Sequence, residues 1–91
     1  MAYVIIELRI MPDSVEINLE KLQEFATTEI KKLGGNIGKI DIKPIAFGLK
    51  SIDITYSMDE KKGGTDELEK ILTKSDDIQN VQVLSVRRAL G

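Results

Sequence analysis

Residues 37–58, IGKIDIKPIAFGLKSIDITYSM, contain two alternating runs that meet at an apolar connection. In the second run, residues 49–58, apolar side chains alternate with small polar and acidic ones, which is the pattern of a strand with one buried face. The first run, residues 37–44, alternates in the same way over a shorter length. Because the gap between the runs is short, they are predicted to pair as an antiparallel hairpin. The rest of the chain can be placed around this hairpin.

The connection itself, residues 44–49, is apolar, whereas a surface turn usually carries polar residues. Gly48 provides the turn chemistry, and Phe47, one of two phenylalanines in the chain, stands directly before it. Two interpretations remain open from these residues. Either the ring folds back and covers the end of the core, as most large apolar side chains do, or it stays exposed for a partner.

The same periodicity analysis extends to both sides of the hairpin. Alternation predicts two further strands, and apolar spacings of three and four residues predict two amphipathic helices. The first helix is expected to end at Gly34 and Gly35, which tolerate a left-handed C-terminal turn. The expected elements are strands over residues 3–11, 37–44, 49–58 and 81–88, and helices capped by Asn18 and Thr65.

This order of strand, helix, strand, strand, helix, strand predicts an α+β fold of the ferredoxin-like βαββαβ type. Residues 1–91 are expected to form a single domain, a sandwich of a four-stranded antiparallel sheet and two helices on one face. The other face of the sheet is then left to solvent or to a partner. Its first strand would present Tyr3 and Ile5 beside Glu7 and Arg9, so that face is mixed in character.

Composition narrows the classes of function. The chain has no cysteine and no histidine, so a disulfide framework, thiolate ligation of a metal and histidine-based proton transfer are excluded. We therefore expect a cytoplasmic protein with neither a metal nor a cofactor. The net charge of −2 and the pI near 5.1 argue against a protein that grips nucleic-acid phosphates. Residues 1–7 lack a basic lead, and we expect neither a signal peptide nor a membrane span.

Other activities of this fold find little support in the residues. An acylphosphatase presents free amides and an arginine in the first strand-to-helix loop, but residues 11–17 contain no glycine or arginine and carry two carboxylates. RNA binding needs aromatic rings on the open face of the sheet, where only Tyr3 and Tyr56 are candidates. Tyr56 shares its face with Ile54 and is expected in the core. A ferredoxin-like small-molecule or RNA-binding module remains the alternative function.

The hairpin connection resembles that of the translation elongation factor 1-beta family. The resemblance runs from Tyr3 to Gly91 and points to the short archaeal form, which consists of the exchange domain alone. The segments that carry it are Pro44-Ile45-Ala46-Phe47-Gly48-Leu49-Lys50, Met11-Pro12, Gly63-Gly64-Thr65, and Val81-Gln82-Val83 leading to Val86-Arg87-Arg88.

The resemblance implies a guanine-nucleotide exchange factor that promotes GDP release from the GTPase elongation factor 1-alpha, so that GTP can rebind during protein synthesis. Such a factor works by protein–protein binding, so it is not an enzyme, and we expect a monomer when free with no direct contact to nucleic acid or membrane. By the same resemblance, Phe47 inserts into a pocket of the GTPase. The hairpin tip and the C-terminal end are expected to form one contact surface, made of Ala46, Phe47, Gly48, Lys50, Arg87 and Arg88.

The chain departs from the eukaryotic members of this family at its C-terminus. Those members carry a lysine next to the last residue, which reaches the magnesium site of the GTPase, whereas this chain has no lysine after Lys74. Arg87 and Arg88 are the nearest cations, and either could approach the phosphate or magnesium region. The alternative is a pair of surface arginines that close the last strand.

Overall fold

The computed structural model describes residues 2–62 and 65–90 of the chain. The order of the elements is strand, helix, strand, strand, helix, strand, as predicted. The elements are β1 (Ala2–Pro12), α1 (Leu19–Lys32), β2 (Asn36–Pro44), β3 (Lys50–Asp59), the short 3-10 helix η1 (Glu60–Lys62), α2 (Asp66–Thr73) and β4 (Ile78–Leu90). Gly63 and Gly64, which belong to one of the segments that carry the family resemblance, lie outside the described residues.

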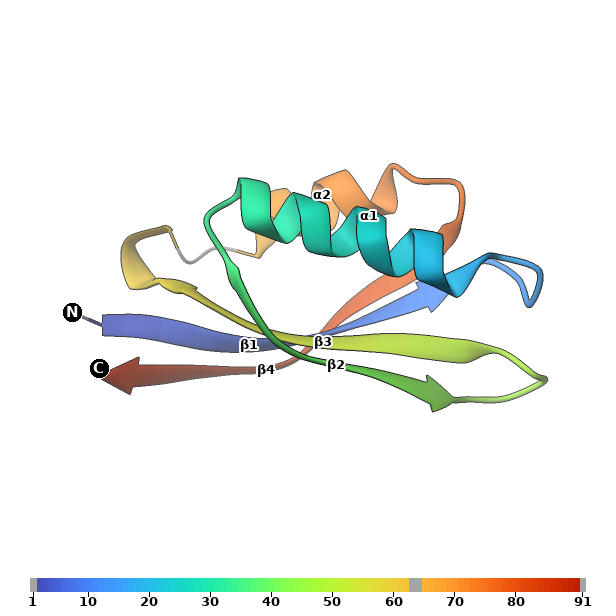
Figure 1. The fold of residues 1–91 in the computed structure, drawn as a ribbon, viewed down its shortest axis with the longest axis horizontal. Helices are drawn as coiled ribbons and strands as arrows, with labels where there is room; N and C mark the ends of the chain where they lie inside the picture. The colour runs from blue at the N-terminus through green and yellow to red at the C-terminus, as the bar shows by residue number, and fades with distance from the viewer. Residues whose placement is uncertain (1, 63–64, 91) are drawn as a thin grey trace.

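The strands form one antiparallel, four-stranded sheet in the order β2-β3-β1-β4. Helices α1 and α2 lie together on one face of this sheet (Figure 1). The opposite face, called the open face below, is not covered by either of these helices. This arrangement is the ferredoxin-like fold, and the predicted fold class is confirmed.

The hydrophobic core lies between the helices and the sheet. Alternate side chains of the central strands β1 and β3 point into it, because successive residues of a strand face opposite sides. Leu8 and Ile54, which pair across these two strands, are both fully buried. The core consists of Ile6, Leu8, Ile10, Leu22, Ala26, Ile30, Ile52, Ile54, Tyr56, Met58, Leu68, Leu72 and Ile78.

The two helices begin differently. The Asn18 side-chain oxygen accepts a hydrogen bond from the backbone N–H of Lys21 at 3.2 Å, which confirms the predicted N-cap of α1. Thr65 is the N-cap residue of α2, as predicted, but its side chain makes no cap hydrogen bond. The physical reason is its backbone, since Thr65 has φ −94° and ψ −13°, whereas a capping side chain reaches back to the helix from an extended conformation. Carboxylates in the first turn of α2, among them Asp66, still complement the helix dipole.

Strand β4 differs from its prediction in extent and in regularity. It begins at Ile78 rather than at residue 81, because Ile78 already pairs with Pro12 of β1. Its register with β1 shifts at two places, the second between Met11 and Pro12. At the first, Glu7 pairs with Ser85 but Leu8 pairs with Val83. The residue between these partners is therefore the extra residue of a β-bulge. The bulge explains why the apolar positions of this strand do not alternate strictly.

Candidate partner-binding surface

The β2–β3 hairpin ends in an exposed aromatic ring. The Phe47 side chain is 97% exposed, whereas Tyr56 on β3 of the same hairpin is 2% exposed. The exposed interpretation of Phe47 is therefore correct, and the ring does not cover the core. Ala46, Gly48 and Lys50, the other predicted site residues of the hairpin, are also exposed. A large apolar side chain in this position adds little to its own fold and is free to contact a partner.

The turn that carries Phe47 is tight and has an unusual backbone. Phe47 and Gly48, its two central residues, both have positive φ angles, 56° and 79°. The Leu49 N–H donates a hydrogen bond to the Ala46 carbonyl at 3.0 Å, and the Ile45 N–H donates to the Leu49 carbonyl at 2.8 Å. Positive φ at both central positions, together with the hydrogen bond from Leu49 to Ala46, defines a type I′ turn. The ring is thus presented from a short, hydrogen-bonded tip.

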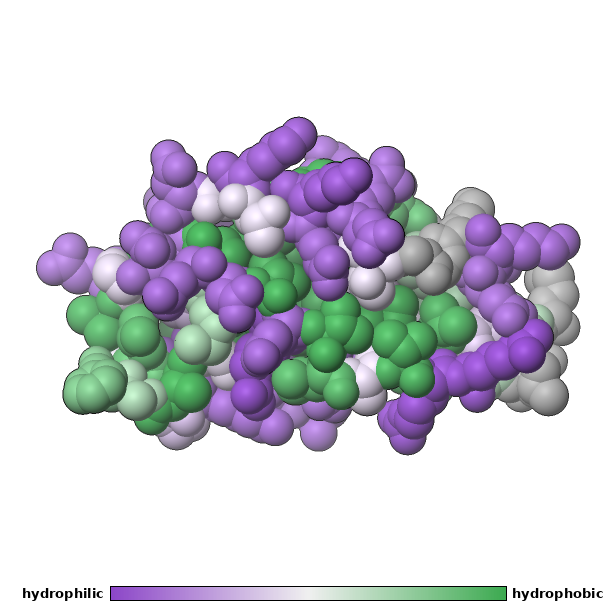
Figure 2. All heavy atoms as spheres, turned by 180° about the vertical axis from the view of Figure 1, so that it is seen from behind, coloured by the Kyte–Doolittle hydropathy of each residue, from purple (hydrophilic) through white to green (hydrophobic). Residues whose placement is uncertain are grey.

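Three more partly exposed apolar side chains lie at this end of the molecule. Ile42 on β2 is 41% exposed, Ile45 is 42% exposed, and Val15 in the β1–α1 loop is 62% exposed. Val15 lies beside the turn, because a Cβ atom placed on Gly48 would stand 3.6 Å from its Cγ1 atom. Figure 2 shows hydrophobic surface at this end. We call Val15, Ile42, Ile45 and Phe47 the apolar tip.

The sequence-based site contained one residue of the apolar tip and missed the other three. Ile45 had a visible signal, since it belongs to the apolar connection of the hairpin. Ile42 was expected on the buried side of its strand, but β2 is an edge strand and the hairpin extends beyond the helices towards its tip (Figure 1). Val15 is a single apolar residue in a polar loop, and only the fold brings it next to the hairpin.

Strand direction places the C-terminal arginines at the other end of the sheet. Because β4 is antiparallel to β1, Leu90 pairs with Ala2, whereas Ile10 pairs with Ile52 near the hairpin. Figure 1 accordingly shows both termini at the end opposite the hairpin tip, along a molecule that is 42 Å long. The hairpin tip and the C-terminal end were expected to form one contact surface. They do not form a contiguous patch, so the expectation is wrong in this respect.

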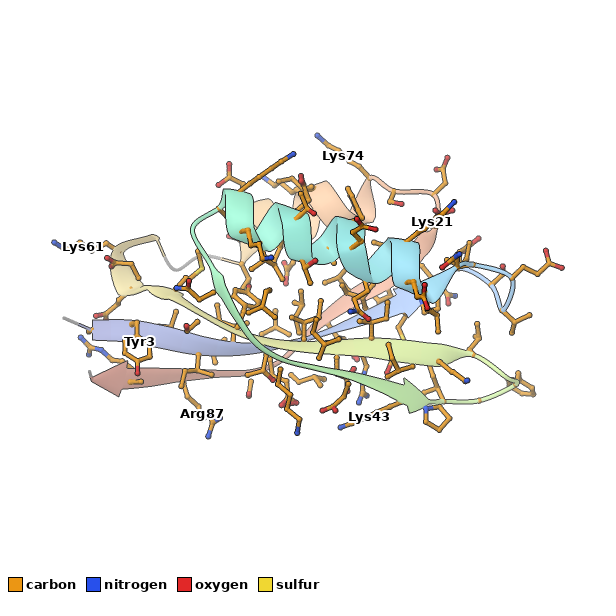
Figure 3. All side chains as sticks on the ribbon, in the orientation of Figure 1. Tyr3, Lys21, Lys43, Lys61, Lys74 and Arg87 are labelled. Carbon is orange, nitrogen blue, oxygen red and sulfur yellow. The ribbon has the colours of Figure 1, made fainter. Side chains whose placement is uncertain are left out.

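The two arginines also lie on opposite faces of the sheet. The register of β4 places Arg87 on the open face, and Figure 3 shows its side chain pointing away from the helices, as Lys43 does. Arg88 lies on the helix side, where its Nη2 atom is 2.9 Å from Oε1 of Glu60. Arg88 is thus engaged within the protein, and Arg87 is the one that the open face presents.

A charged network occupies the middle of the open face. Arg9 donates from Nε and Nη2 to the two carboxylate oxygens of Asp53, both at 3.0 Å. Ser51 Oγ donates to the same carboxylate at 3.1 Å, and Lys43 Nζ lies 3.5 Å from it. The hydrogen bonds from Arg9 lower the pKa of Asp53 below its usual value and outweigh burial, which alone would raise it. These groups satisfy one another, so the network is best explained as structural.

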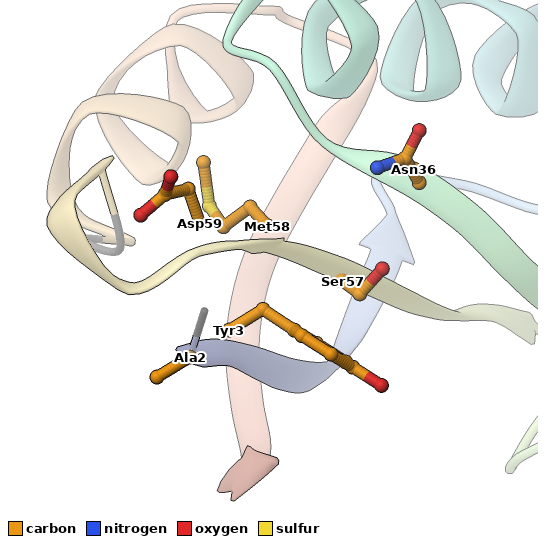
Figure 4. A pocket seen from close by; sticks show the side chains of 6 residues that line it. All are labelled: Ala2, Tyr3, Asn36, Ser57, Met58 and Asp59. Atoms are coloured by element: carbon orange, nitrogen blue, oxygen red, sulfur yellow. The ribbon is translucent and has the colours of Figure 1, made fainter. Parts of the chain in front are cut away.

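A shallow hollow of about 360 Å³ lies at the end of the sheet opposite the hairpin (Figure 4). Tyr3 is the aromatic ring that lines it, with Asn36 and Ser57 as polar neighbours. Tyr56, the other tyrosine considered for RNA binding, lies in the core as expected. Sheet-based RNA binding stacks two or three bases on several rings. Tyr3 alone therefore gives the RNA-binding alternative little support.

Residues 2–62 and 65–90 hold neither an acidic metal-binding cluster nor a membrane-spanning helix. This part of the chain contains no group of three or more acidic side chains that could hold a metal ion. It also contains no helix that is both long enough and apolar enough to cross a membrane.

The chain is a small ferredoxin-like domain that presents an exposed aromatic ring at a hairpin tip. Residues 5–89 match the family described as the EF-1 guanine nucleotide exchange domain, and the chain belongs to this family. Elongation factor 1-beta of Methanocaldococcus jannaschii is 36% identical over 89 residues, which cover 98% of this chain and 100% of the relative. Elongation factor 1-beta of Methanosphaera stadtmanae is 39% identical over 83 residues, which cover 91% of this chain and 92% of the relative.

Family membership confirms the function predicted from the resemblance. The chain is a guanine-nucleotide exchange factor of translation elongation, which promotes GDP release from elongation factor 1-alpha rather than catalysing a chemical conversion. Nearly the whole length of this chain and of its relatives takes part in the match.

Solved structures of other proteins resemble the fold only. The C-terminal domain of the MgtC protein from Mycobacterium tuberculosis has a TM-score of 0.63 and 12% identity, over 97% of this chain and 87% of that one. The designed protein Foldit4 has a TM-score of 0.60 and 17% identity, over 98% of both chains. At such low identity these likenesses say nothing about function.

Proposed function

We propose that the apolar tip, with Phe47 at its centre, is the surface by which this exchange factor binds elongation factor 1-alpha. The observation that carries the proposal is the 97% exposure of the Phe47 ring. Aromatic anchors that fill a pocket on the partner supply a large share of binding energy in protein interfaces. Val15 and Ile45 then form the apolar rim that excludes water around the anchor.

The binding event promotes GDP release through a coupling free energy. GDP in a GTPase is held by backbone groups around its phosphates and by Mg²⁺. A partner that binds best to the conformation in which these contacts are disturbed therefore lowers the affinity of the GTPase for GDP. The coupling is reciprocal, because bound nucleotide must lower the affinity of the GTPase for the exchange factor to the same extent. Each tenfold change in affinity corresponds to about 1.4 kcal/mol of coupling.

Arg87 is the second contact that we include in the proposal. It projects from the open face at the end of the sheet away from the hairpin, so a partner that reaches both must lie along the open face. Ala46, Gly48 and Lys50 complete the proposed site. Arg88, which the sequence also placed there, pairs with Glu60 on the helix side and is not part of the proposed contact. We place the activity in the cytoplasm, with the factor acting as a monomer when it is free.

The test is the release of a fluorescent GDP analogue from elongation factor 1-alpha of the same source, with excess unlabelled nucleotide and the factor at catalytic concentration. Wild type should accelerate release. Phe47→Ala should need at least a tenfold higher concentration for half-maximal release, which corresponds to a loss of about 1.4 kcal/mol or more of binding free energy. Phe25→Ala is the matched control, because Phe25 is the other phenylalanine and lies on α1 with 37% exposure.

The results test the exchange function and the proposed binding surface independently. If wild type accelerates release but Phe47→Ala is equally active, the apolar tip is not the binding surface. If folded wild type has no effect on the GTPase, the proposed partner is wrong. Phe47→Ala should change the free energy of unfolding by less than about 0.5 kcal/mol, as expected for a surface position.

A further inference from the structure

We propose that the type I′ turn is itself a determinant of exchange activity, with Gly48 as the positioning residue that fixes the direction of the Phe47 ring. The inference deepens the proposed function and rests on it. It starts from a conflict between the residue and its conformation, since Phe47 is the only residue other than glycine with positive φ in the part of the chain that the structure describes.

Phe47 is a poor residue for the conformation that it adopts. The first central position of a type I′ turn favours asparagine, aspartate or glycine, because a side chain with a large Cβ substituent crowds the backbone at positive φ. Phe47 nevertheless has φ 56° there and gains no burial in return, with 97% of the side chain exposed. Strain of this kind at an exposed position is typical of functional sites, where the backbone aims a side chain at a partner.

The hairpin prevents the turn from relaxing. The β2–β3 ladder continues up to the pair Pro44 and Lys50, and the hydrogen bond from Leu49 to Ala46 closes the loop. Five residues, 45–49, join this pair, and a second hydrogen bond from Ile45 to Leu49 leaves only Phe47 and Gly48 between the bonded Ala46 and Leu49. A type I′ turn at these two residues matches the twist of the flanking strands. Another turn type would redirect the ring or disturb the ladder, so ring direction and turn type are linked.

Gly48 allows the turn to be tested without touching the ring. It has φ 79°, which alanine adopts only with strain. A Cβ atom at this position would stand 3.6 Å from Val15 Cγ1, an ordinary van der Waals contact, so a methyl group fits in the available space. The effect of Gly48→Ala is therefore conformational rather than steric. Gly48→Asn is the conservative variant, because asparagine tolerates the left-handed conformation better than other side chains.

The first experiment measures exchange at increasing concentrations of each variant. Gly48→Ala should raise the concentration needed for half-maximal GDP release at least fivefold, with little change in the maximal rate, because the ring is present but misdirected. Gly48→Asn should recover much of this loss, with a half-maximal concentration between those of wild type and Gly48→Ala. A Gly48→Ala protein that is folded and equals wild type overturns the inference, while an inactive wild type would overturn the proposed function instead.

The second experiment needs no partner. Replacing Phe47 by asparagine relieves the backbone strain in the turn, whereas replacing it by alanine does not. The melting temperature of Phe47→Asn should therefore be about 3 °C or more above that of Phe47→Ala. Phe47→Asn should also lose exchange activity, since it lacks the ring. Equal melting temperatures of these two variants would show that the turn is not strained by residue 47, and the inference would fall even if Gly48→Ala were inactive.

Discussion

Arg9 and Asp53, which are 44 positions apart in the chain, form a two-pronged ion pair across β1 and β3 on the open face. Asp53 is only 4% exposed although it lies on the sheet face without helices. Arg9 covers its carboxylate, and Ser51 and Lys43 complete its polar surroundings. A polar cluster centred on the buried Asp53 carboxylate therefore links β1, β2 and β3 on the open face.

Asp53→Asn should destabilise the fold. The substitution removes the charge and places an amide N–H₂ group against the Arg9 guanidinium, so a charge-assisted hydrogen bond worth about 2 kcal/mol is lost. The melting temperature should fall by about 10 °C. Asp41→Asn is the control, because the Lys39–Asp41 pair is more exposed, at 70% and 41%, and should contribute less than about 0.5 kcal/mol. Equal losses in both variants would contradict this assignment.

The same ion pair predicts a pH dependence. Arg9 lowers the pKa of Asp53 in the folded state, so its stabilising contribution is complete above the unfolded pKa of about 3.9 and is lost as the pH falls through the folded value. The difference in melting temperature between wild type and Asp53→Asn should be constant from about pH 7 to pH 5 and shrink below about pH 4. Melting curves across this range test it, and a difference that persists unchanged at pH 2 would exclude the ionised carboxylate as its source.

Local patterns predicted the elements because each of them depends on neighbouring residues. The alternation in β3 correctly placed Ile54 and Tyr56 in the core and Asp53 on the other side. The burial of Asp53 could not be predicted in this way, because it results from Arg9 on a different strand. The bulge in β4 is likewise set by pairing with β1 and has no local signal beyond the imperfect alternation.

The candidate site was predicted in part for a similar reason. The turn chemistry of Gly48 was visible in the sequence, but whether other elements cover Phe47 is a property of the whole fold. The separation of Arg87 from the hairpin could have been predicted, because the antiparallel order of the strands places the end of β4 beside the start of β1. Val15 could not, since only the packing of the β1–α1 loop brings it to the tip.

Tyr56→Phe should stabilise the protein. The Tyr56 hydroxyl is buried and has no hydrogen-bond partner among the described residues, and burial, together with the charge of Glu69, raises its pKa to about 12. Removing a buried hydroxyl that lacks a protein partner eliminates a desolvation cost of about 1 kcal/mol, which would raise the melting temperature by about 4 °C or more. Tyr3→Phe is the matched control, because Tyr3 is 36% exposed and its hydroxyl can be solvated. A lower melting temperature for Tyr56→Phe would mean that the hydroxyl is satisfied in the folded protein.

Arg87→Ala and Arg88→Ala should have different effects, although the residues are adjacent. Arg87 projects from the open face, so its removal should raise the half-maximal exchange concentration two- to fivefold at low salt, with a smaller difference at high salt, as for a charge at the rim of an interface. Arg88 pairs with Glu60 at 2.9 Å on the helix side, with 67% of its side chain exposed. Arg88→Ala should therefore leave exchange within twofold of wild type and change stability by less than about 1 kcal/mol. If Arg88→Ala impairs exchange and Arg87→Ala does not, the partner does not lie along the open face and must approach this end from the helix side.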